Sequence, residues 1–171
     1  MTTTTSTTTS TSTHPSDGDD LLVRKTLFVK ATPQRAFDVF TKEMGSWWPL
    51  ASHHVGKVDA KGIVIEPRVG GSLMEVGIDD STCTWGHVLE WTPPRRFAFT
   101  WELDATFRID PSFDTRVEVS FTAESDGTRV ELVHRGLRAY GDKAGEMMAI
   151  FDSPGGWTGL LETFGKHACA A

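Results

Sequence analysis

Several histidines and one cysteine in this chain could together bind a metal ion. Cys83 and His87 lie four residues apart, and His53, His54 and His134 supply three further imidazoles. Thiolates and imidazoles are the usual ligands of zinc. In an extended strand, however, four residues span roughly 13 Å, which is too far for Cys83 and His87 to reach one ion. The sequence therefore predicts no metal site, and no motif in it indicates a cofactor.

His87 and His134 remain as candidates for general acid–base catalysis. Strict alternation along 82–91 places His87 on the face that carries Trp85, and alternation along 128–134 turns His134 inward with Leu132. A histidine in an apolar cavity could protonate or orient a carbonyl or a phenol. Alternatively, each is a core histidine bonded to a neighbouring group. Both interpretations stay open, and the chain has neither a Gly-x-Ser-x-Gly motif nor a helix-opening phosphate loop.

Large aromatic side chains gather on the same predicted inner faces. Alternation turns Phe97, Phe99, Trp101 and Leu103 inward on one strand, and Val117, Val119 and Phe121 inward on another. Part of this surface is expected to be core, and part is expected to face a ligand, because ligand pockets are mostly apolar with a few polar groups. The residues predicted to line such a pocket are Trp47, Trp48, Trp85, His87, Phe99, Trp101, Phe121, His134, Trp157 and Leu160, with Glu75 as a further polar group.

The elements that position these residues begin with a strand over 21–31. Thr32 and Pro33 then provide an N-cap and a proline at the first helical position, which predicts a short helix over 33–44. The adjacent Trp47 and Trp48 are expected either in the core or at the mouth of a pocket. From residue 62 onward, alternating segments separated by Gly, Asp and Pro turns predict antiparallel strands near 63–65, 73–78, 82–91, 97–103, 116–123 and 128–134.

The C-terminal part of the chain reads as two helical segments. Met147, Met148 and Phe151 belong to the first, and the Ser-Pro-Gly-Gly stretch at 153–156 is expected to end it. In the second, over 156–167, Trp157, Leu160, Leu161 and Phe164 follow the i, i+3, i+4, i+7 spacing of an amphipathic helix. This helix must bury its apolar side, and the curved sheet is the surface available for it.

Composition limits the classes of protein to which the chain could belong. The 171 residues suffice for one domain, expected over 21–171, after a Thr- and Ser-rich tail over 1–20 that is too polar to fold. A net charge of −6 without a basic cluster argues against nucleic acid and against an anionic membrane. No apolar run approaches the length of a membrane span. Two cysteines, expected to be reduced, and no signal-peptide pattern favour a cytoplasmic protein.

Six short segments, in order, resemble one family. They are TPQRAF at 32–37, PRVGG at 67–71, GHV at 86–88 before Pro93-Pro94, FAFTW at 97–101, GTRV at 127–130 and GW at 156–157. The chain resembles the START-like, or SRPBCC, superfamily of the birch pollen allergen, in the branch of the activators of heat-shock-protein-90 ATPase. The resemblance spans about 21–168. It implies an α+β helix-grip fold: a curved antiparallel sheet of about six to seven strands around a long C-terminal helix, with two short helices after the first strand.

The resemblance implies a cavity between sheet and helix but no single reaction, because one fold hosts many functions. Together with the aromatic inner faces, it predicts binding of a hydrophobic or aromatic small molecule without catalysis. One alternative is a cyclase- or dehydratase-type enzyme that uses His87 or His134. Another is a co-regulator of a chaperone ATPase, and the sequence also allows a homodimer.

Overall fold

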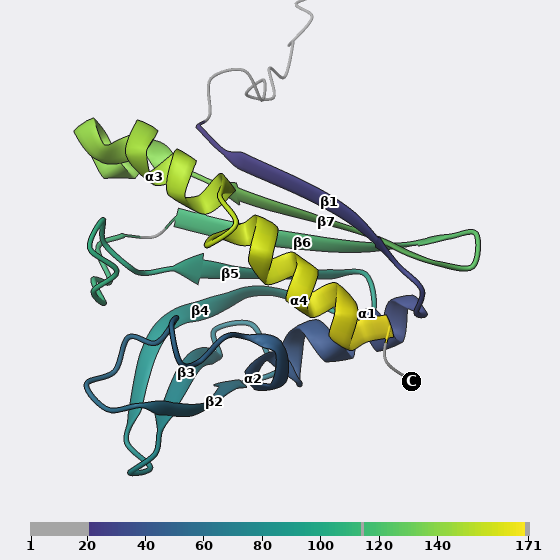
Figure 1. Ribbon diagram of the computed structural model, residues 1–171, viewed down its shortest axis with the longest axis horizontal. Helices are drawn as coiled ribbons and strands as arrows, with labels where there is room; N and C mark the ends of the chain where they lie inside the picture. Colours follow the sequence, from purple (N-terminus) through teal and green to yellow (C-terminus); the bar gives the residue numbers. More distant parts are fainter. Residues whose placement is uncertain (1–20, 114, 170–171) are drawn as a thin grey trace, which may run out of the picture.

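The computed structural model describes residues 21–113 and 115–169, and the predicted tail over 1–20 lies outside this range. Seven antiparallel strands form one curved sheet in the order β1-β7-β6-β5-β4-β3-β2. The strands are β1 (Val23–Val29), β2 (Ala60–Ile65), β3 (Ser72–Gly77), β4 (Thr82–Thr92), β5 (Arg96–Trp101), β6 (Thr115–Glu124) and β7 (Gly127–Arg135). The predicted helix-grip fold is confirmed, because a long C-terminal helix crosses one face of this sheet (Figure 1).

The helical elements follow the predicted order, except that an unpredicted 3₁₀ helix precedes the last two. They are α1 (Pro33–Thr41), α2 (Met44–Trp47), the 3₁₀ helix η1 (Leu137–Lys143), α3 (Ala144–Asp152) and α4 (Trp157–Cys169). The predicted break between the last two is present, and Gly156 explains its tightness. A Cβ at Gly156 would lie 2.3 Å from the carbonyl oxygen of Ile150, so only glycine fits where the chain turns from α3 into α4. None of these helices, within the described residues, is long and apolar enough to cross a bilayer.

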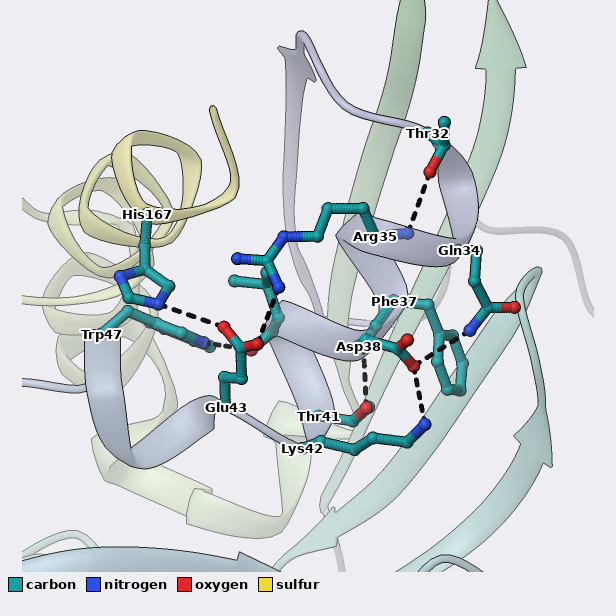
Figure 2. A network of polar contacts seen from close by, with 11 residues as sticks. Thr32, Gln34, Arg35, Phe37, Asp38, Thr41, Lys42, Glu43, Trp47 and His167 are labelled. Carbon is teal, nitrogen blue, oxygen red and sulfur yellow. Dashed lines mark hydrogen bonds and ion pairs between the residues drawn. The ribbon is translucent and has the colours of Figure 1, made fainter. Parts of the chain in front are cut away.

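A polar network fastens α1 and α2 to the far end of α4 (Figure 2). Arg35 Nη1 donates to Glu43 Oε1 at 2.7 Å, and Glu43 Oε2 lies 3.2 Å from His167 Nε2 on α4. The hydrogen bond from Arg35 holds the pKa of Glu43 below its usual value. Trp47 Nε1 donates to the carbonyl of Val39 at 2.9 Å, so the Trp47 indole is fixed beneath α1. The network positions α2 at the start of the long loop that leads to β2.

Strand β4 departs from the predicted alternation at two bulges. Leu73 pairs with Gly86 but Met74 pairs with Thr84, so one residue of β4 is extra, and a second is extra where β4 pairs with β5 between Val88 and Glu90. Each extra residue reverses the side to which the following side chains point. Trp85 and Val88 are therefore both buried, whereas His87 is exposed. The prediction that His87 points inward is wrong for this reason.

The other strands follow the predicted alternation. Phe97, Phe99 and Trp101 on β5 are buried, as are the inward residues predicted on β6. On β7, His134 is completely buried. Three adjacent strands therefore present an apolar concave face to the helices.

Candidate functional site

A cavity of about 200 Å³ lies between the concave face of the sheet and the loop over 48–59 that joins α2 to β2. Strands β2, β3, β4 and β5 provide one wall and the loop provides the other, while Leu103 and Phe107 from the segment after β5 complete the lining. The lining residues are Trp48, Ser52, His53, His54, Val55, Ile63, Glu75, Trp85, Trp101, Leu103 and Phe107. The cavity is thus mostly apolar, with its polar groups concentrated on the loop and on Glu75.

Three tryptophans form the aromatic wall of the cavity. The ring centroid of Trp85 lies 5.9 Å from that of Trp48 and 5.4 Å from that of Trp101. Trp48 is held by a 2.9 Å hydrogen bond from its Nε1 to the carbonyl of His53, which shapes the start of the loop. All three were predicted from the sequence to line a pocket, and the structure brings them together. Large, nearly rigid indole faces of this kind suit a flat aromatic ligand.

Glu75 is the buried carboxylate of the cavity, and the loop is attached to it. Its side chain is 4% exposed. The backbone N–H of Val55 donates to Oε2 at 2.7 Å and that of Gly56 donates to Oε1 at 2.8 Å. Cys83 Sγ lies 3.9 Å from Oε1, and burial together with the Glu75 charge raises the pKa of this thiol. A charged acceptor with two backbone donors holds Val55 and Gly56 against the sheet.

His53 attaches the same loop to the helix break at the other side of the cavity. Its Nε2 lies 2.7 Å from the carbonyl oxygen of Gly155, which can only accept, so Nε2 carries the proton in this contact. Its Nδ1 lies 2.8 Å from Ser52 Oγ, which then donates to it in the neutral form of the ring. His54 Nδ1 bonds within the loop, to the carbonyl of Gly56 at 3.2 Å. The loop is thus fastened to the sheet by Glu75 and to the α3–α4 turn by His53.

A second hollow, a groove of about 500 Å³, lies on the other side of the Val55–Gly56 segment. Its lining residues are Val55, Gly56, Lys57, Val58, Glu75, Gly77, Asp79, Ser81, Thr82, Cys83 and Ile109. The cavity and the groove share Val55 and Glu75. The two spaces therefore adjoin at these two residues.

His134 lies in the core and does not line the cavity. Trp157 Nε1 donates to its Nδ1 at 3.2 Å, because an indole N–H can only donate. Its Nε2 must then carry the proton and donates to Thr115 Oγ1 at 2.9 Å. The Thr115 hydroxyl in turn donates to the carbonyl of Trp101. Burial lowers the pKa of His134 to about 3, so the ring is neutral. These contacts support the interpretation of His134 as a core histidine.

His87 lies on the opposite, convex side of the sheet. Its Nδ1 is 2.6 Å from Glu102 Oε2, which also accepts a 2.5 Å hydrogen bond from Thr100. The His87 side chain is about half exposed and is not among the cavity residues. Within residues 21–113 and 115–169, no three His, Cys, Asp or Glu side chains gather as a metal site.

The other predicted site residues belong to the core, and the unpredicted cavity residues come from the 48–59 loop, from β2 and from the segment after β5. Buried away from the cavity lining are Trp47, Phe99, Phe121, Trp157 and Leu160. The cavity residues that the sequence pattern does not predict are Ser52, His53, His54, Val55, Ile63, Leu103 and Phe107. The available signal was the pair His53-His54, because it follows the predicted pocket residue Trp48 after only four residues.

Comparison with known families gives a match over residues 30–167 to the model described as "Activator of Hsp90 ATPase homolog 1-like protein". The chain belongs to this family. The match begins at the end of β1 and extends into α4, so it includes every residue of the cavity. The resemblance inferred from the six segments is confirmed. A comparison with curated proteins finds no match.

Several proteins of known structure are similar to this chain. An anthrahydroquino-gamma-pyrone synthase, Txn09, in complex with a molecule called SUM, is 38% identical, with 85% of this chain and 95% of that chain covered and a TM-score of 0.58. CalC, a self-sacrificing resistance protein from Micromonospora echinospora, is 26% identical over 87% and 94% of the two chains, with a TM-score of 0.64. The Aha1 dimer from Colwellia psychrerythraea is 12% identical over 87% and 96%, with a TM-score of 0.55, and shows the fold alone.

Proposed function

We propose that this protein binds a flat aromatic small molecule in the cavity beneath the 48–59 loop. The observation that carries the proposal is the convergence of Trp48, Trp85 and Trp101 on one hollow that also contains the Glu75 carboxylate. Apolar walls with one or two polar groups are typical of small-molecule sites. The 38% identity to a synthase named for an anthrahydroquino-gamma-pyrone supports a polycyclic phenol as the ligand class.

The test is a binding titration with a matched pair of tryptophan variants. Trp85→Leu removes part of the cavity wall, and Trp91→Leu removes an indole that packs on Phe37 and does not line the cavity. Titration calorimetry with hydroxylated naphthalenes and anthraquinones should show binding to wild type. Trp85→Leu should weaken it at least tenfold, or about 1.4 kcal/mol, and Trp91→Leu less than twofold. Absence of binding to every compound, or equal losses in both variants, would overturn the proposal.

A second candidate function is ring closure of such a ligand, which the relation to the synthase favours. The structure offers no support for His87 as the acid–base residue, because this residue lies outside the cavity, and both ring nitrogens of His134 already have partners. Glu75 lines the cavity, and each of its carboxylate oxygens has a lone pair beyond the one that accepts from the loop, so we infer that it is the candidate to accept a phenolic proton. The test is to incubate an anthrahydroquinone carrying an unclosed side chain with wild type and with Glu75→Gln. Equal conversion by wild type, variant and buffer would remove the candidate.

Interaction with a chaperone ATPase stays a prediction. The family description names an Hsp90 ATPase activator, and the 12% identity to Aha1 bears only on the fold.

A further inference from the structure

The sizes of the two hollows decide what each could hold alone. A cavity of about 150 Å³ in another protein accommodates benzene, so the 200 Å³ cavity here suits one ring or two. Sites for larger ligands usually measure about 300–1,000 Å³. The adjoining groove is about 500 Å³. A ligand of three or more fused rings therefore needs part of the groove as well as the cavity.

The barrier between the two hollows is short and is held mainly through backbone groups. Val55 and Gly56 donate their N–H groups to Glu75, and neither hydrogen bond depends on a side chain of the loop. Gly56 is required for this close approach, because a Cβ there would lie 2.8 Å from Glu75 Oε1. When the segment moves outward, water can hydrate its two amides. The segment can thus leave the sheet without leaving its own amide groups unsatisfied.

Glu75 is in a different position, because it is anchored on β3 and stays beneath the loop. A buried carboxylate that loses its donors is costly unless other donors replace them. A ligand that displaces the Val55–Gly56 segment must therefore bring a hydrogen-bond donor to Glu75. A phenolic hydroxyl on a flat aromatic ring meets this need while its rings contact the tryptophan wall.

We infer that the Val55–Gly56 segment is a gate, closed by its hydrogen bonds to Glu75, that opens to join the cavity and the groove around a hydroxylated polycyclic aromatic ligand. This inference rests on the proposed function and adds the size class and the polar group of the ligand. The gate excludes three-ring compounds while it is closed. In the open state Glu75 binds the ligand hydroxyl in place of the two amides.

The native Cys83 allows the gate to be locked reversibly. A Cβ at Gly56 would lie 3.5 Å from Cys83 Sγ, so Gly56→Cys places a second sulfur within reach of a disulfide after a small movement. The same Cβ would crowd Glu75 Oε1 at 2.8 Å, so every comparison is made between forms that all carry Gly56→Cys. The variant is made with Cys169→Ser, which removes the other free thiol. Mass spectrometry verifies the bond in the oxidised sample. The matched control carries Cys83→Ser in addition, so it has the same residue at 56 but cannot be locked.

Three probes separate ligand size from hydrogen bonding: 2-naphthol, 2-hydroxyanthraquinone and unsubstituted anthraquinone. Oxidised and reduced forms of the lockable variant should bind 2-naphthol within twofold of each other. Oxidation should weaken binding of 2-hydroxyanthraquinone at least tenfold and should have no effect in the Cys83→Ser control. The reduced form should bind anthraquinone at least tenfold more weakly than its hydroxylated analogue.

A separate variant, Glu75→Gln, tests the hydroxyl preference without a disulfide. The amide is a weaker acceptor than a carboxylate, so the preference for 2-hydroxyanthraquinone over anthraquinone should fall below threefold. Equal affinity of the oxidised and reduced forms for 2-hydroxyanthraquinone would overturn the gate, as would an unchanged preference in Glu75→Gln. Either result would leave the proposed function intact if 2-naphthol binds. If wild type binds none of the three probes, both the gate and the proposed function are overturned.

Discussion

The concave face of the sheet has two halves that the chain covers in different ways. Over most of β5, β6 and β7 the helices pack directly: the ring centroid of Phe40 on α1 lies 6.1 Å from that of Phe97 on β5 and 6.0 Å from that of Phe121 on β6. Phe164 of α4 in turn lies 5.2 Å from Phe40. Over β3 and the bulged part of β4 the cover is the 48–59 loop, and the cavity remains beneath it. We call these the helix-covered half and the loop-covered half.

The difference shows in how each half satisfies a buried polar group. His134 in the helix-covered half bonds to the side chains of Trp157 and Thr115, which are themselves buried. Glu75 in the loop-covered half bonds to backbone amides of a loop. Partners of the first kind can be removed only by unfolding the core, whereas partners of the second kind can be exchanged for a ligand. The loop-covered half is therefore where binding is expected, and the helix-covered half is where stability is expected.

The largest predicted contrast is in stability. Phe164→Ala removes a ring with no exposed surface from the helix-covered half and should lower the free energy of unfolding by about 3–5 kcal/mol. Phe107→Ala removes a 39% exposed ring from the rim of the cavity and should cost less than about 1 kcal/mol. Urea denaturation of the two variants measures both values. Similar losses would contradict the division of the concave face into two halves.

An intermediate effect is predicted for acid. His134 stays neutral in the folded protein down to about pH 3, whereas in the unfolded chain it takes up a proton below its ordinary value of 6.5. Between these values the unfolded state binds more protons, so stability rises with pH, by up to about 1.4 kcal/mol per pH unit from this residue. Above about pH 6.5 the contribution is complete.

Denaturant titrations of wild type and His134→Gln from pH 4 to 7 test this prediction. The variant should be less stable than wild type at neutral pH. Its free energy of unfolding should rise less steeply with pH, by an amount that corresponds to the uptake of up to one proton. His53→Gln is the matched control, because it removes a half-buried histidine of the loop and leaves the core histidine in place. An equal slope in wild type and His134→Gln would show that the buried ring does not control acid sensitivity.

The smallest predicted effect concerns the loop itself. His53→Ala removes the hydrogen bond to Gly155 and should lower the free energy of unfolding by at most about 1.5 kcal/mol, because the contact is partly exposed. Hydrogen exchange of the 50–58 amides should accelerate, and 2-naphthol should associate faster in stopped-flow measurements. His54→Ala breaks a bond that stays inside the loop and should change these rates less. Larger rate changes in His54→Ala than in His53→Ala would contradict the attachment of the loop through His53.

Sequence patterns predicted the helix-covered half more completely than the loop-covered half. Alternation on β5, β6 and β7 identified the buried residues, since these strands pair without interruption. It failed at His87 because a bulge leaves no mark in the alternation of residue types. The contributions of His53 and Val55 could not be predicted, because hydrogen bonds to Gly155 and Glu75 join positions far apart in the sequence.

The packing of the tryptophans also determines the fluorescence of the protein. Trp47, Trp48, Trp85, Trp101 and Trp157 form a connected series in which each ring centroid lies within 6.1 Å of another. Indoles this close transfer excitation energy from one ring to the next before they emit, so the emission of the five is depolarised. A quinone that touches only Trp85 would then quench the whole group. The protein would report occupancy of its cavity through a nearly complete loss of emission from these five residues.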